Sequence, residues 1–92
     1  MPIAWVTRHQ GMGGTTAFAT QQEAVEQYVL YLSPPVRRAD LFRVTHEGDV
    51  GTFDVRHRIE GIVFDLPEYV PAGLALSVPP GVIVQHVLSS EA

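Results

Sequence analysis

Asp40 and His57 are the two residues whose types and expected positions could support acid–base chemistry. The stretch FRVTHEGDVGTFDVRH, residues 42–57, alternates apolar and polar side chains on both sides of Gly48-Asp49, which predicts a β-hairpin with a two-residue turn. That register puts Asp40 opposite His57. A carboxylate beside a partly buried imidazole raises the pKa of the imidazole and fixes its tautomer, as a general base requires. Because no nucleophile can be assigned nearby, the sequence favours a structural hydrogen bond for this pair and leaves catalysis as the alternative.

Four arginines form a second group that could bind a partner. The predicted strand brings the two short basic stretches that contain them near each other. With Phe42 and Phe53 they could suggest a sheet that binds RNA, where aromatic rings stack on bases. The alternation of apolar and polar side chains along the hairpin puts these rings on one face and the arginines of the second strand on the other. A surface that binds carboxylates of a protein partner is therefore favoured over one that binds RNA. The group consists of Arg37, Arg38, Arg56 and Arg58.

The sequence contains no pattern typical of a metal or phosphate site. It has no cysteine, and its histidines form no H-x-x-H or H-E-x-x-H motif. His46 and His57 lie at opposite ends of the predicted hairpin, too far apart to share a metal. The glycine-rich GMGGTT, residues 11–16, lacks the third glycine of a dinucleotide loop and the lysine of a P-loop. We therefore expect neither a metal nor a cofactor.

Composition narrows the class of protein. Ninety-two residues are enough for one domain, which we place at residues 1–92. The net charge of −4 disfavours nucleic acid as a partner. Hydrophobic residues make up 46% of the chain and charged residues 17%, against about 25% charged in typical domains. Some apolar surface is therefore expected to stay outside the core, and such patches mark interfaces.

A hairpin and a helix are expected in the first third of the chain. Residues 3–8 and 15–19 read as strands around the glycine-rich turn. Thr20 and Glu23 have the spacing of a capping box, which starts a helix over about 21–32. Ser33-Pro34 ends it, because proline lacks the donor that a helix needs. An apolar stripe should face the core, whereas Leu30 falls on the polar side and is expected to be exposed. The stripe contains Ala24, Val25, Tyr28, Val29 and Leu32.

Further strands are expected over 41–58, 62–64, 74–78 and 82–88, with Pro80-Gly81 suited to a type II turn. The predicted fold class is α+β: one amphipathic helix packed on a curved, mostly antiparallel sheet of about six strands.

The expected function is that of a small, non-enzymatic protein–protein interaction module. Self-association as a homodimer is its simplest form, and an adaptor or inhibitor of a larger assembly is a second form. The alternative is a small enzyme or ligand pocket centred on His57 and Asp40, and RNA binding is less favoured. The first residues lack a basic segment and no apolar run approaches 18 residues, so a cytoplasmic location without a membrane partner is expected. The expected partner-binding residues are Leu30, Arg37, Arg38, Arg56, Arg58 and Tyr69.

Overall fold

A computed structural model describes residues 3–10, 14–32, 38–46, 53–66 and 70–91, with the backbone alone at residues 10, 46, 53–57 and 91. The described elements are five strands and two helices. In chain order they are β1 (Ile3–Gln10), β2 (Gly14–Phe18), α1 (Gln21–Tyr31), β3 (Arg38–His46), α2 (Phe53–Phe64), β4 (Ala75–Ser77) and β5 (Val82–Glu91).

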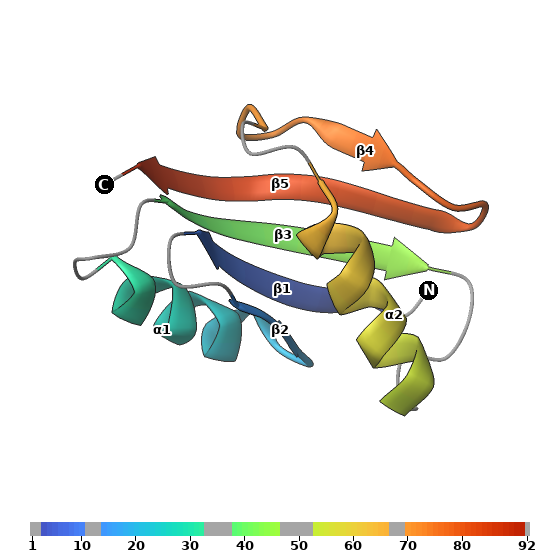
Figure 1. Cartoon of the computed structure of the whole chain (residues 1–92), viewed down its shortest axis with the longest axis horizontal. Coiled ribbons are helices and arrows are strands. Elements are labelled where there is room, and N and C mark those ends of the chain that lie inside the picture. Colours follow the sequence, from blue (N-terminus) through green and yellow to red (C-terminus); the bar gives the residue numbers. More distant parts are fainter. Residues whose placement is uncertain (1–2, 11–13, 33–37, 47–52, 67–69, 92) are drawn as a thin grey trace.

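The strands form one antiparallel sheet in the order β2-β1-β3-β5-β4 (Figure 1). α1 connects β2 to β3, and α2 leads from β3 towards β4. β5 follows β4 in the chain but inserts between β3 and β4. The predicted α+β class is confirmed. Within the described residues, however, the sheet has five strands and the domain has two helices, in place of about six strands and one helix.

The two helices pack on opposite faces of the sheet. Side chains alternate between the faces along a strand, and neighbouring residues of β1 and β3 belong to different apolar clusters. Val6 and Phe42 lie in the cluster that contains α2, whereas Trp5 and Leu41 lie with α1. The α2 cluster is the larger one. Its buried members are Ala4, Val6, Ala17, Phe42, Val44, Ile59, Val63, Val70 and Val84.

The predicted helix after Thr20 is confirmed. The Thr20 hydroxyl accepts a hydrogen bond from the Glu23 amide at 3.3 Å and donates one to the Glu23 carboxylate at 3.0 Å. The helix ends at Tyr31, and its buried residues are Ala24 and Tyr28. The apolar stripe is therefore narrower than expected, because Val29 and Leu32 are exposed.

The predicted second strand of the hairpin, residues 53–58, is wrong. These residues begin α2, which continues through 62–64, where another strand was expected. Ile59, Val63 and Leu66 follow the spacing of a helix and pack with the large cluster, so a period of 3.6 residues overrides the local alternation. The predicted turn at 48–49 lies in a stretch that the structure does not describe.

The predicted turn at Pro80-Gly81 is confirmed. Gly81 has a φ of 80°, and the Val82 amide donates to the Pro79 carbonyl at 3.1 Å, as a type II turn with Pro80-Gly81 at its centre requires.

Candidate functional site

Asp40, near the start of β3, is the centre of a buried charged cluster. Its side chain is fully buried on the face that carries α2. Arg38, two residues earlier on the same face, donates from Nε to Asp40 Oδ1 at 2.9 Å and from Nη2 to the Val70 carbonyl at 3.1 Å. The strand alternation thus positions a carboxylate and its cation side by side, and the cation also holds the chain after α2.

Arg8 on β1 is the second cation of the cluster. Because Arg8 pairs with Asp40 across the β1–β3 ladder, both side chains project from the same face. Arg8 Nη2 donates to Asp40 Oδ2 at 3.1 Å, and Nη1 donates to the carbonyls of Val63 at 3.0 Å and Leu66 at 3.1 Å. Its guanidinium lies 5.1 Å from the centre of the Phe42 ring. Arg8 therefore joins the C-terminal end of α2 to the sheet.

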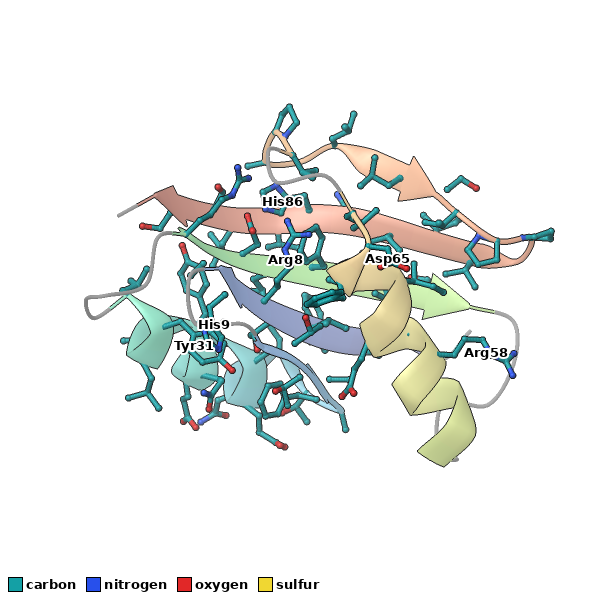
Figure 2. All side chains as sticks on the ribbon, viewed as in Figure 1. Arg8, His9, Tyr31, Arg58, Asp65 and His86 are labelled. Carbon is teal, nitrogen blue, oxygen red and sulfur yellow. The ribbon has the colours of Figure 1, made fainter. Side chains whose placement is uncertain are left out.

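His86 on β5 completes the cluster. Its Nε2 lies 2.8 Å from Asp40 Oδ1, and because the ionised carboxylate can only accept, this nitrogen carries the proton. The His86 ring contacts Phe42 at 4.8 Å between ring centres. Its Nδ1 is buried and bonds to no described atom. Figure 2 shows Arg8 and His86 near each other over the middle of the sheet. Asp40 bonds to both of them.

The cluster fixes the ionisation of Asp40. Burial raises the pKa of this carboxyl, but hydrogen bonds from His86, Arg38 and Arg8 and the charge of Arg8 outweigh burial, so the pKa lies below its ordinary value. Two guanidinium groups, those of Arg8 and Arg38, therefore face one carboxylate. All four residues are buried, at 0–5% exposure. Such an enclosed cluster joins β1, β3, β5 and α2, and it offers a substrate no direct contact with the acid or the base.

The expected catalytic pair rests on a register that the structure does not contain. His57 belongs to α2 and not to a strand opposite Asp40, and the histidine that bonds to Asp40 is His86. The register that paired Asp40 with His57 is therefore wrong, and Asp40 bonds instead to Arg8, Arg38 and His86. The His57 side chain itself is outside the described part of the chain.

The expected partner-binding residues divide into three groups. Leu30 is 66% exposed, as predicted, and Arg58 is exposed on α2, where Figure 2 shows it extending away from the helix. Arg38 is a correction: at 5% exposure and bonded to Asp40, it belongs to the interior. The side chains of Arg37, Arg56 and Tyr69 fall among residues that are not described.

A second feature lies on the face of the sheet that carries α1. This helix packs on β1, β2 and β3, and no described helix covers the rest of that face. Two rows of side chains cross the uncovered part, with Ile83 at 48% exposure. We call these rows the open face. They are Arg43, Gln85 and Ala75 in one row, next to Trp5 of the α1 cluster, and Ile3, Thr45, Ile83 and Ser77 in the next.

Arg43 is the charged residue of the open face that sequence reasoning missed. Its side chain is half-buried between Trp5 and Gln85, and its Nε is buried without a hydrogen-bond partner in the described part of the chain. The alternation along the predicted strand did place Arg43 on the face opposite Phe42. Sequence alone could not show that the Nε of Arg43 lacks an acceptor among the described residues.

The described residues contain neither a candidate metal centre nor a helix suited to a membrane. No three histidine, aspartate or glutamate side chains gather as metal ligands would. None of the described helices is long and apolar enough to pass through a membrane.

Comparisons with protein-family models, with curated proteins and with solved structures found no match to this chain.

Proposed function

We propose that this chain is a non-enzymatic protein–protein interaction module that self-associates through the side of the sheet carrying α1. The observation that carries the proposal is a group of large apolar side chains exposed on that one side. An excess of large apolar side chains exposed on one side of a small domain favours a binding surface on that side. The group consists of Val29 at 56%, Leu30 at 66% and Leu32 at 45% exposure on or after α1, with Ile83 at 48% and Leu88 at 39% on β5.

The burial of the titratable cluster also favours interaction over catalysis. A general acid or base must reach the proton that it transfers. Asp40 and His86 are both fully buried, and the donors around Asp40 hold it in its ionised form. The cluster is better explained as a device that stabilises the fold. A homodimer is the simplest assembly for a small domain with spare apolar surface.

The test is a pair of matched substitutions measured by sedimentation equilibrium. Leu30→Glu places a charge on the α1 side, and Phe64→Glu does the same on α2, on the other side of the sheet, at 61% exposure. Burying one leucine contributes about 1.5–3 kcal/mol, so Leu30→Glu should weaken association by roughly tenfold or more. Phe64→Glu should leave association unchanged, and both variants should melt like the wild type.

Two outcomes would contradict the proposal. The first is a wild-type chain that stays monomeric at high protein concentration. The second is an oligomer that Phe64→Glu dissociates while Leu30→Glu leaves it intact, which would place the interface on the other side of the molecule.

A further inference from the structure

The α1 side of the sheet is covered at one part and open at another. α1 lies over Ala39 and Leu41, in the first half of β3, whereas Arg43 and Thr45, in the second half of the same strand and on the same face, lie in the open face. Within the described residues, α1 and a stretch of sheet that no helix covers therefore lie side by side on one face. Two copies related by a two-fold axis can each place their helix on the vacant stretch of the other.

Arg43 gives the open face a chemical preference. A buried guanidinium nitrogen without an acceptor costs free energy, since the group has lost water and gained no partner. Arg43 Nε is in this state among the described residues. A carboxylate is the acceptor that best matches a guanidinium, because it can accept two parallel hydrogen bonds. The open face thus favours an acidic group carried on an apolar element.

The outer side of α1 carries both an acidic group and apolar side chains. The exposed ridge of α1, which we call the α1 ridge, consists of Gln22, Glu26, Val29 and Leu30, spaced so that they lie on one side of the helix. The helix contains no lysine or arginine. Of its two glutamates, Glu23 is engaged by Thr20, whereas the exposed Glu26 carboxylate makes no ion pair with a described residue.

We infer, resting on the self-association proposed above, that two copies pack reciprocally: the α1 ridge of each copy lies on the open face of the other, and Glu26 of each bonds to Arg43 of the other. Val29 and Leu30 then cover Ile83 and the neighbouring small side chains of β4. The contact is isologous, so the same pair of charges occurs twice across one two-fold axis. The occupant of the open face is therefore a second copy of this chain.

The edge of the sheet is a less favourable route to the same assembly. β2 is an edge strand, and its Ala17 amide already donates to Glu60 Oε1 at 2.9 Å. A second copy that added its own strand there would have to displace this carboxylate. β4, at the other edge, has only three residues. Among the described residues, neither edge offers what the α1 side offers, which is Glu26 without an ion pair, Arg43 with an unbonded Nε, and exposed apolar side chains.

The test uses charge reversal, because a reciprocal contact makes an unusual prediction for mixtures. Glu26→Arg and Arg43→Glu each create two like-charge contacts per homodimer. Each should raise the dissociation constant of the dimer by on the order of tenfold or more. In a mixture of the two variants, the heterodimer has one reversed and one natural pair, and both are attractive. Native mass spectrometry should therefore find the heterodimer well above its statistical share, and the double variant should dimerise nearly like the wild type.

Arg58→Glu is the matched control, since this exposed arginine lies on α2, on the other side of the sheet. It should leave dimerisation unchanged. Glu26→Arg is a substitution at an exposed helical position, so it tests the contact even if Arg43→Glu fails to fold.

The outcomes separate the two proposals. A dimer that tolerates Glu26→Arg, or a mixture that shows no preference for the heterodimer, overturns the reciprocal contact and leaves self-association standing. A wild-type chain that remains monomeric overturns the proposed function itself, and the contact with it.

Discussion

Replacing Asp40 with asparagine removes the carboxylate that Arg8, Arg38 and His86 share. The asparagine side chain has nearly the same shape, so the core keeps its packing. Its amide group, however, brings two more donors to a place where donors already converge from three sides. The change therefore tests charge and hydrogen bonding with little change in volume.

The expected loss of stability is large. The side chains of Arg8 and Arg38 are 3% and 6% exposed, so they cannot recover the lost partner from water. Breaking a buried ion pair by removing one partner costs about 3–5 kcal/mol. A domain of this size has roughly 5–15 kcal/mol of stability in total. With a urea dependence of about 1–3 kcal/mol per molar, Asp40→Asn should lower the unfolding midpoint by about 1 M or more.

The assay is urea unfolding followed by circular dichroism at several pH values. The pKa of Asp40 is lower in the folded chain than its ordinary value of 3.8, so the carboxylate contributes stability above that pH, and this contribution is lost as pH falls through the folded pKa. The difference between wild type and Asp40→Asn should therefore be greatest at neutral pH and shrink in acid below about pH 4. Asp65→Asn, at an exposed position, should change stability by less than about 0.5 kcal/mol.

Two results would refute this reasoning. If Asp40→Asn is as stable as Asp65→Asn, the cluster does not depend on its carboxylate. If the destabilisation stays constant from neutral pH to pH 3, the loss comes from packing and not from the ionised group.

Four other substitutions test the local structure. Thr20→Ala should lower stability by about 1 kcal/mol in urea unfolding, because the cap of α1 is lost; an unchanged midpoint would contradict the cap. Gly81→Ala should destabilise by about 1 kcal/mol or more in thermal melts, since Gly81 has a φ of 80°, whereas Gly61→Ala, in α2 with open space around it, should stabilise by up to about 1 kcal/mol. Glu60→Ala should cost about 1 kcal/mol and increase light scattering on heating, because it removes the carboxylate that accepts from the Ala17 amide at the sheet edge; a variant that stays clear would show that this edge does not depend on Glu60.

Local signals predicted the elements that local interactions decide. Thr20 with Glu23 fixed the start of α1, and Pro80-Gly81 fixed the turn before β5, because each depends on residues within four positions. α2 was missed because Phe53, Val55, His57 and Ile59 imitate a strand. The competing helical spacing of Ile59, Ile62, Val63 and Leu66 was present and could have been counted.

The buried cluster could be predicted only in part. Asp40 and Arg38 share a face because they are two residues apart in β3, but the predicted strand began at residue 41 and left both outside it. His86 alternates with Val82 and Val84, which indicates an inward position, but its approach to Asp40 depends on β5 lying beside β3. Strand order is a property of the whole fold. It joins Asp40 to Arg8 over 32 positions and to His86 over 46, and no local pattern encodes such contacts.

The position of β5 has a consequence for how this chain reaches its folded state. β3 and β4 both hydrogen-bond to β5, which follows them in the chain. Neither strand therefore completes its pairing until β5 has inserted between them. Closing such long loops makes folding slow relative to helical domains of the same length. Any intermediate without β5 exposes the free edge of β3 beside Phe42 and Val44, which is the kind of segment from which aggregation starts. Asp40 and Arg38 lie on that same edge, and before His86 arrives their charges act as gatekeepers against pairing with another unfinished chain.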